Sequence, residues 1–187
     1  AFGYDPRIFP IPADPAEWPA AQNASYCYID DTDGAATDTA NTYGYPDKPR
    51  LTIPTTGTFV KVVLAGATNS DAFLTSAIAG TPTVPCFVTS PAGTSVSGSW
   101  KFNNNTDLII DRLIVVYNNE GSGYVTTGTN DYHVFKAREN AINIWLEGND
   151  FHDTYGDGIQ IGNDTYETKT ENVYIYNNTL YNNRENG

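Results

Sequence analysis

The most constraining feature of this 187-residue chain is a segment near its end that recurs with a shift of 29 positions. The first copy spans 143–153 and the second spans 172–182. The matched pairs are Leu146 with Ile175, Asn149 with Asn178, Phe151 with Leu180, and Gly158 with Gly187. A fixed period with alternating apolar positions indicates a solenoid in which each repeat forms one turn.

Asparagine occupies one corner of each repeat. Asn tolerates left-handed backbone, and its amide can bond to the Asn of the next turn. We expect Asn149 and Asn178 to form such a ladder, with a structural rather than a catalytic role. Alternate side chains of each short strand would point inward, so stacked turns would bury a continuous apolar column.

Short β-segments precede the repeat and predict strands at four places, which are 26–29, 59–64, 84–88 and 95–102. The segment 70–79 is compatible with one short helix or with a capping loop. Leu108 fits the frame of Leu146, which lies 38 positions later. Solenoids tolerate insertions at corners, so we expect the surplus residues in an outward loop at 118–131.

Two patterns resemble a known fold family. One is the repeated phrase of Asn and alternating apolar residues, with Gly-Asp-Gly-Ile-Gln-Ile at 156–161, and the other is the Tyr- and Pro-rich segment 43–54. Both resemble the pectate-lyase-like superfamily. The resemblance implies an all-β, right-handed parallel β-helix domain over residues 23–187, after an extended Pro-rich arm at 1–22. That superfamily includes lyases, hydrolases, adhesins and structural proteins, so the fold alone does not predict an activity.

The arm at 1–22 holds five of the eleven prolines of the chain. Proline removes hydrogen-bond donors and favours extension, which argues against a central strand here. Six large apolar residues lie between the prolines, namely Phe2, Tyr4, Ile8, Phe9, Ile11 and Trp18. Exposing them would be costly, so we expect an assembly arm that covers either its own domain or a neighbouring copy.

A formal net charge of −12 limits the partners of this chain. Nonspecific nucleic-acid binding needs a basic surface, so that class is excluded. The charge also argues against an unaided grip on polyanionic polysaccharides, and it favours divalent cations. No apolar run approaches the roughly 20 residues that cross a bilayer, so we expect no membrane span.

The start of the chain and its cysteines favour a secreted protein. It begins at Ala1 without a basic or apolar leader, which we interpret as a mature N-terminus. Cys27 and Cys86 would suit that location as a disulfide closing a loop of about sixty residues, with two buried free thiols as the alternative. In a glycoprotein, the Asn-x-Ser/Thr motif makes glycan-attachment candidates of Asn23, Asn104, Asn163 and Asn177.

One segment offers candidate catalytic residues. If Phe135 and Ala137 point inward, Lys136 and Arg138 point outward from the same strand. The superfamily resemblance implies that a basic residue of this kind abstracts a proton beside a calcium ion. A solvated strand face whose charges are paired at random explains the same residues, and it requires no cofactor.

The acidic residues that would complete such a site lie on the following turns. Asp153 and Asp157 are the candidate metal ligands, and His152 and Gln160 would bind sugar hydroxyls in the same groove. The motifs that the resemblance implies for the hydrolase branch are missing, apart from one Asn-Thr-Asp without its partners. The acidic loop at 30–38 has a weak calcium-loop spacing, and we expect it to be solvated.

The register of the repeat predicts that another strand begins where the chain reaches Gly187. An uncapped solenoid end leaves bare strand edges, which invite another chain. Either the natural protein continues past Gly187, or this end is covered in an assembly. We therefore hypothesise a secreted structural or adhesive subunit that self-assembles head-to-tail into a glycosylated extracellular filament or surface layer. The alternatives are a calcium-dependent polysaccharide lyase-like protein and a glycan-binding module. In the latter, Tyr174 or Tyr176 would stack on sugars, and we expect only one of the two to face outward.

Overall fold

The computed structural model describes residues 9–14, 18, 25–66, 77–91, 94–97, 100–111, 114–116, 135–138, 140–153, 158–162 and 169–183. Within these ranges the chain is all-β, and it contains no helix. The strands form curled sheets in which every strand pair of the described residues is parallel. No helix of the described residues has the length and hydrophobicity to cross a membrane.

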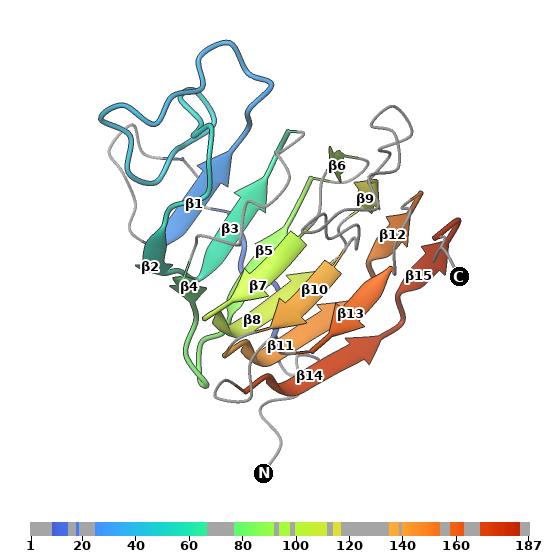
Figure 1. Cartoon of the computed structure of the whole chain (residues 1–187). Helices are drawn as coiled ribbons and strands as arrows, with labels where there is room; N and C mark the ends of the chain where they lie inside the picture. The colour runs from blue at the N-terminus through green and yellow to red at the C-terminus, as the bar shows by residue number, and fades with distance from the viewer. Residues whose placement is uncertain are drawn as a thin grey trace, which may run out of the picture.

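The strands belong to three sheets (Figure 1). The large sheet has the order β1 (Tyr26–Ile29), β3 (Lys61–Leu64), β5 (Cys86–Thr89), β8 (Thr106–Asp111), β11 (Ile142–Glu147) and β14 (Glu171–Tyr176). It also includes β2 (Thr56–Thr58), which pairs with β4 (Ala77–Ala79), and β4 pairs in turn with β8. The second sheet contains β7 (Trp100–Asn103), β10 (Phe135–Arg138) and β13 (Ile159–Ile161). The third contains β6 (Ser95–Ser97), β9 (Ile114–Val116), β12 (Asp150–His152) and β15 (Thr179–Tyr181).

Consecutive strands are therefore distributed over different sheets. The last nine strands form three successive triplets, and each triplet contributes one strand to each sheet. The four predicted upstream strands are present, but 95–102 contains two strands, β6 and β7, in different sheets. The segment 70–79 was compatible with a short helix or a capping loop, but its last three residues form the strand β4. Residues 70–76 lie outside the described residues.

Pairing of the last strands confirms the 29-residue register. Leu146 pairs with Ile175, and Phe151 pairs with Leu180. The upstream frame was predicted wrongly, because Ile110 rather than Leu108 pairs with Leu146, and the shift is 36 residues instead of 38. A displacement by two residues keeps every side chain on its own face of the strand, so alternation alone does not distinguish the two frames.

The asparagine ladder is confirmed. Asn149 donates from its backbone N and from Nδ2 to Asn178 Oδ1, over 2.9 and 2.8 Å, and its Nδ2 also lies 2.9 Å from the Ile110 carbonyl oxygen. The left-handed residues are not these two but the preceding ones, Gly148 (φ 64°) and Asn177 (φ 52°). Each ladder residue thus links strands while its neighbour makes the bend.

A second column of this kind begins each long strand. Asp107, Asn143 and Asn172 all have a left-handed backbone, with φ of 56°, 57° and 56°. Asn143 Nδ2 donates to Asp107 Oδ1 (2.7 Å), and Asn172 Nδ2 donates to Asn143 Oδ1 (2.8 Å). Asn and Asp tolerate this conformation better than other side chains, so the same residues bend the chain and link its strands.

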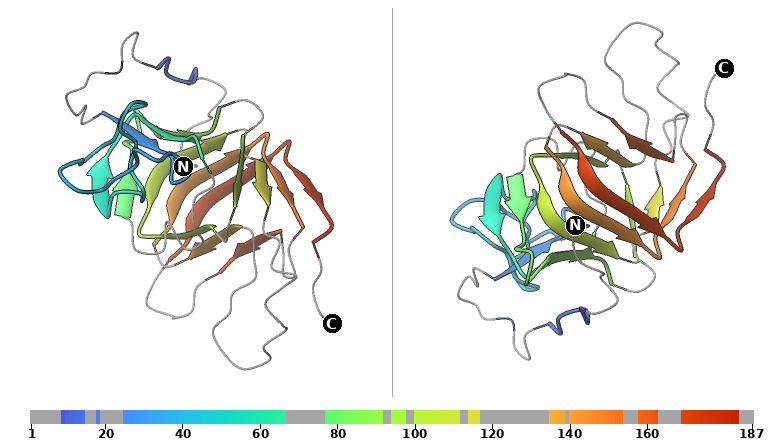
Figure 2. Two further views of the ribbon diagram at one scale, coloured as in Figure 1. Left: turned by 90° about the horizontal axis from the view of Figure 1, so that it is seen from above. Right: turned by 90° about the horizontal axis from the view of Figure 1, so that it is seen from below.

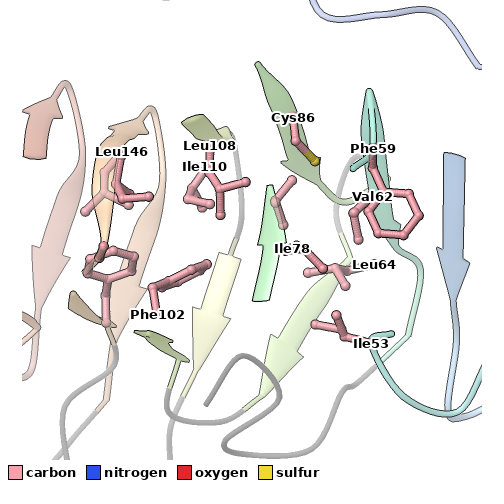
Figure 3. Close-up of a cluster of buried hydrophobic side chains, with 14 of the residues drawn as sticks. Ile53, Phe59, Val62, Leu64, Ile78, Cys86, Phe102, Leu108, Ile110 and Leu146 are labelled. Carbon is pink, nitrogen blue, oxygen red and sulfur yellow. The ribbon is translucent and has the colours of Figure 1, made fainter. Parts of the chain in front are cut away.

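The apolar core lies between the three sheets (Figures 2 and 3). Leu108 and Leu146 reach it from the large sheet, and Phe102 and Phe135 reach it from the second sheet. Phe135 contacts Phe102 and the Phe151 of the third sheet, with ring centroids 5.0 and 6.2 Å apart. Truncating a buried Phe to Ala typically costs about 3–5 kcal/mol, so these contacts hold the sheets together.

Both cysteines are buried in this core as free thiols, so the predicted disulfide is wrong. Strand order gives the reason, because β3 lies between β1, which carries Cys27, and β5, which carries Cys86. Neighbouring strands are about 4.8 Å apart, and two such spacings exceed the roughly 7 Å that a disulfide allows between Cα atoms. Burial raises the pKa of the Cys27 thiol to about 12, and it raises the pKa of Cys86 as well.

The outer edge of β1 is covered by the segment 41–50. Tyr28 N donates to the Tyr43 carbonyl oxygen (2.9 Å), and Arg50 N donates to the Tyr28 carbonyl oxygen (3.0 Å). Asp30 N donates to the Arg50 carbonyl oxygen (3.1 Å). These bonds occupy the edge of β1, so this end of the large sheet is closed.

The covering segment is fixed by a buried asparagine and a left-handed glycine. Asn41 Nδ2 donates to the carbonyl oxygens of Thr37 (2.8 Å) and Pro49 (3.0 Å), and its Oδ1 accepts from Gly44 N. Gly44 has φ of 77°, and a Cβ placed on it would overlap the Tyr28 carbonyl oxygen. Only glycine therefore fits at this position without strain.

Candidate functional site

The predicted catalytic lysine is buried. Phe135 and Ala137 lie in the core, as expected. Lys136 is on the other face of β10, but only 8% of it is exposed, so it does not offer a solvated basic group. The backbone of Arg138 pairs with Asn103, and the side chain of Arg138 lies outside the described part of the structure.

The predicted groove is not assembled, because its residues belong to different sheets. Lys136 of β10 stands opposite Gln160 of β13, whereas His152 lies on β12 of the third sheet. Phe135 and Phe151, the sequence neighbours of Lys136 and His152, meet inside the core. Alternation then places Lys136 and His152 on the outer faces of two separate sheets. The groove prediction is therefore corrected.

The predicted metal ligands do not form a cation site in the described residues. Asp153 Oδ2 lies 2.8 Å from His152 Nδ1, and Asp153 Oδ1 accepts from Asn182 Nδ2 (3.0 Å). Asp157 lies outside the described residues. Among those described, no group of three His, Cys, Asp or Glu side chains could hold a metal ion. Asp153 instead serves a third side-chain column at a left-handed corner, with φ of 58°.

The outer face of the third sheet carries an aromatic stack. His152 stacks on Tyr181 with ring centroids 4.5 Å apart and planes inclined by 9°. Desolvation, then the carboxylates of Asp150 and Asp153, raise the pKa of the Tyr181 hydroxyl. A His–Asp pair beside a Tyr is a fragment of an acid–base site, but no nucleophile or oxyanion donor is described next to it.

The acidic loop at 30–38 uses its carboxylates for its own structure. Asp30 Oδ1 accepts from Thr32 N (3.0 Å) and Thr32 Oγ1 (2.6 Å), and Asp33 Oδ1 accepts from Ala35 N (2.7 Å). Partial burial, followed by the charge of Asp30, raises the pKa of Asp31. These short-range hydrogen bonds stabilise turns, and this role explains why acidic residues alternate along the loop.

A row of large side chains crosses the outer face of the large sheet. The row consists of five paired residues, one each on β3, β5, β8, β11 and β14, which are Lys61, Phe87, Ile109, Trp145 and Tyr174. Trp145 and Tyr174 are stacked, with centroids 4.2 Å apart and planes inclined by 13°. We call these five residues the outer row. Sequence reasoning missed it, although Trp145 and Tyr174 are matched positions of the 29-residue repeat.

The described part of the arm covers this row in its own molecule. Phe9 and Ile11 pack with Phe87, Ile109 and Trp145 in a second apolar cluster, separate from the core. Figure 2 shows this segment, in the darkest blue, on the side of the large sheet away from the interior. Of the two predicted surfaces, the described arm residues therefore cover their own domain. Phe2, Tyr4 and Ile8 lie outside the described residues.

A buried lysine holds the arm at its centre. Lys61 Nζ lies 2.7 Å from Asp14 Oδ1 and donates to the Pro12 carbonyl oxygen over 2.9 Å. Further along, Trp18 packs edge-on against Tyr26 and Tyr28, with ring centroids 5.8 and 5.3 Å apart. A half-open hollow of about 300 Å³ lies beside the ion pair, between the arm and β3 and β5.

The two tyrosines proposed as sugar platforms both face outward. Tyr174 pairs with Trp145 in the outer row, and Tyr176 pairs with Glu147, two residues further along the same strand. Residues i and i+2 of a strand share a face, so the expectation that only one of them faces outward was wrong. Tyr176 is 51% exposed.

The last strands expose apolar side chains that would be core residues elsewhere. Ile175 is 49% exposed and Leu180 is 45% exposed, whereas their partners Leu146 and Phe151 are buried. In the described residues no strand pairs with the far edge of β13, β14 or β15. Figure 1 shows β14 and β15, in red, at the opposite end from β1. We call the outer edge of these three strands the open edge.

The structure describes two of the four glycan-attachment candidates. Asn177 is exposed at its bend, and the Thr179 that completes its motif is exposed too. Asn104 is also exposed, but its Oδ1 accepts a hydrogen bond from Asn140 Nδ2 (3.0 Å). Asn23 and Asn163 lie outside the described residues.

Comparison with family models, with curated proteins and with solved structures found no match to this chain. The resemblance to the pectate-lyase-like superfamily thus stays a prediction from the sequence patterns. The surfaces that bear on function are the covered outer row, the closed edge of β1 and the open edge.

Proposed function

We propose that this chain is a structural or adhesive subunit, built as a right-handed parallel β-helix, which associates with further copies through its open edge. The recurrence of strand triplets over three parallel sheets supports the β-helix. Parallel strands joined by crossovers are right-handed in almost all proteins, which supports the hand.

The observation that carries this proposal is the concentration of exposed apolar side chains at the open edge. Five of the seven large hydrophobic residues that are exposed in the described structure lie on β13, β14 and β15. They are Ile161, Ile175, Tyr176, Leu180 and Tyr181. An apolar patch of this kind marks an interaction surface, and bare strand edges beside it offer backbone hydrogen bonds as well.

The magnitude is adequate for association. Five large side chains, each about half exposed, present roughly 500 Å² of surface, which is on the order of 10 kcal/mol of gross hydrophobic free energy per copy. Association costs at least several kcal/mol in lost motion, so the surplus supports a specific contact rather than a very tight one.

The calcium-dependent lyase hypothesis loses its geometric basis. Lys136 is buried, His152 and Asp153 lie at another sheet, and Asp157 lies outside the described residues, so of the predicted groove only Gln160 stands beside Lys136. An extracellular location stays part of the proposal, supported by the exposed Asn177 motif. The free thiols remove the disulfide as an argument for that location.

Glycan binding is a second candidate, favoured by one observation. Tyr174 and Tyr176 project from the same face of β14, and the stack with Trp145 holds Tyr174 in place. Rigid aromatic faces beside the polar Glu147 suit a sugar with apolar and hydroxyl sides. Loss of binding in a glycan array on Tyr176→Ala, with Tyr45→Ala as the control, would support this function.

The test of self-association compares matched substitutions. Ile175→Lys and Leu180→Lys place charges on the open edge, while Val84→Lys and Leu51→Lys change residues of similar exposure (49% and 42%) elsewhere. Sedimentation velocity should show association of the unchanged chain, weakened at least tenfold by the first pair only. A chain that stays monomeric at high micromolar concentration, or equal effects of both pairs, would contradict the proposal.

A further inference from the structure

We propose that the hollow between the arm and strands β3 and β5 binds one neutral sugar unit. This hollow lies on the outer face of the large sheet, toward its β1 end and away from β14. The inference goes beyond the proposed self-association and does not depend on the open edge.

Small side chains on the sheet make room for the hollow. Lys61 and Phe87 are paired on β3 and β5, and two residues further along the same face the paired residues are Val63 and Thr89. A Val beside a Thr fills less space than a Lys beside a Phe, so the outer face is lower there. The arm bounds this low region with Ile11, which leaves a half-open space of about 300 Å³. Small-molecule sites begin at about this size.

An ion pair presents a donor and an acceptor to the hollow. Lys61 Nζ lies 2.7 Å from Asp14 Oδ1 and 2.9 Å from the Pro12 carbonyl oxygen, which occupies two of its three hydrogens. The third hydrogen has no acceptor in the described part of the chain. Asp14 Oδ2 likewise has no described donor, and both residues line the hollow. A ligand can therefore bond to the ammonium and to the carboxylate at the same place.

A buried hydroxyl adds a third polar contact. Thr89 lines the hollow and is only 9% exposed, and its hydroxyl makes no hydrogen bond within the described residues. The neighbouring Ser90 Oγ donates to the Thr94 carbonyl oxygen (3.5 Å), and its oxygen can still accept. Buried polar groups normally have a partner, so a ligand hydroxyl would satisfy the one that the fold leaves to solvent.

The balance of charge selects a neutral ligand. Lys61 and Asp14 compensate each other, so an anion would meet the carboxylate and a cation would meet the ammonium. A hydroxyl avoids both conflicts, because its oxygen accepts from Lys61 while its hydrogen is donated to Asp14. A second hydroxyl nearby then reaches Thr89. Neighbouring hydroxyls on a neutral frame are the chemistry of a sugar.

The remaining walls of the hollow suit the carbon skeleton of such a ligand. Ile11, Val63 and Pro91 give it an apolar lining opposite the polar groups. Mostly apolar walls with a few placed polar groups are the usual composition of a small-molecule site. The free sugar and the end unit of a longer glycan carry the same groups, and the half-open rim admits either.

Saturation-transfer NMR on the full chain tests this site with glucose, galactose and mannose. We expect at least one of these neutral hexoses to bind with a dissociation constant on the order of 1–10 mM, as suits so small a ligand. Glucuronate and glucosamine should bind roughly fivefold more weakly or worse, because each carries a charge. Tighter binding of maltotriose than of glucose would identify the end of a glycan as the ligand, and the reverse order would identify the free sugar.

Matched variants assign the binding to the hollow. Thr89→Val keeps the shape of the side chain and removes its hydroxyl, so hexose binding should weaken roughly fivefold or more. Ser90→Ala is the second variant, in case Thr89→Val folds poorly. Thr58→Val, at an exposed Thr of β2 outside the hollow, is the control and should change nothing.

Asp14→Asn tests the charge argument. It keeps an acceptor for Lys61 but removes the carboxylate, so the uncompensated ammonium should now favour glucuronate over the neutral hexoses. An unchanged preference would overturn the assignment of the ion pair as the sugar contact. No binding of any hexose at about 100 mM would overturn the site, as would equal losses in Thr89→Val and Thr58→Val. The sedimentation test of self-association uses other residues, so each proposal can fail without the other.

Discussion

At the scale of single residues, asparagine joins one strand to the next. The Asp107–Asn143–Asn172 column runs across the large sheet, and the Asn149–Asn178 ladder lies beside it. Each links matched positions of successive strands. One amide can accept from one strand and donate to another, so a repeated Asn stabilises the stack and fixes its register. The repeat at 29 residues therefore carries structural information beyond hydrophobic alternation.

Removing the buried ladder residue should expose this coupling. Asn149→Ala removes the side-chain donor to the Ile110 carbonyl oxygen and one of the two donors to Asn178 Oδ1, so we expect the unfolding free energy to fall by about 1–3 kcal/mol. Asn178→Ala removes the same contact from the other side. Urea denaturation should show that the double variant loses less than the sum of the two single losses. Strictly additive losses would mean that the ladder does not couple the strands.

The two thiols give a pH-dependent prediction. Burial raises the pKa of Cys27 from 9.0 to about 12, so the folded state keeps this proton while the unfolded state releases it. Stability is therefore fully present below pH 9 and declines between pH 9 and 12, by about 1.4 kcal/mol per pH unit for each such thiol. Urea titrations from pH 8 to 11 should show a shallower decline for Cys27→Ala.

Parallel slopes for the two proteins would contradict the buried, protonated thiol. A reductant should also leave the melting temperature unchanged, since no disulfide is present.

The pairing of Cys27 with Cys86 was mispredicted because cysteine spacing contains no information on strand order. The insertion of β3 between β1 and β5 is a non-local property of the sheet.

At the scale of elements, the cover over β1 and the arm over the outer row close two surfaces that strands alone leave open. The cover depends on one left-handed glycine. Gly44→Ala should lower the unfolding free energy by about 1–3 kcal/mol, because its Cβ would overlap the Tyr28 carbonyl oxygen at φ of 77°. Gly34→Ala, in the acidic loop that precedes the cover and with nothing within 4 Å of its Cβ, is the control. Thermal denaturation showing equal losses would refute this role.

The arm depends on its central ion pair. Lys61→Met removes the bond to Pro12 and the pair with Asp14, and we expect it to loosen the arm over Trp145. Acrylamide should then quench the tryptophan fluorescence more strongly than in the unchanged chain. Lys169→Met, at a side chain 79% exposed, should have no effect. Unchanged quenching in Lys61→Met would show that apolar contacts alone hold the arm.

Element-scale predictions from sequence succeeded where information was local and failed where it depended on sheet membership. Strand β1 and the inward positions Phe135 and Ala137 follow from alternation over a few residues. The groove around Lys136 failed, because alternation does not specify which sheet a strand joins. His152 is also outward-facing, but on a different sheet.

At the scale of the whole molecule, the two ends of the large sheet differ. One end is closed by the chain itself, and the other ends in the exposed Ile175 and its neighbours. The 29-residue period and the Asn149–Asn178 ladder were readable from the sequence, as were the all-β class and the parallel strands. The closed end was not, since it depends on contacts of Tyr43 and Arg50 that follow no repeat. This asymmetry is the physical basis for proposing association through the open edge.

Cryo-electron microscopy of the associated chain tests this account most directly. It predicts particles of more than one copy in which the open edge lies at the junction between copies, with each arm on the outer row of its own copy. Particles in which the edge of β14 faces solvent in every copy would contradict it.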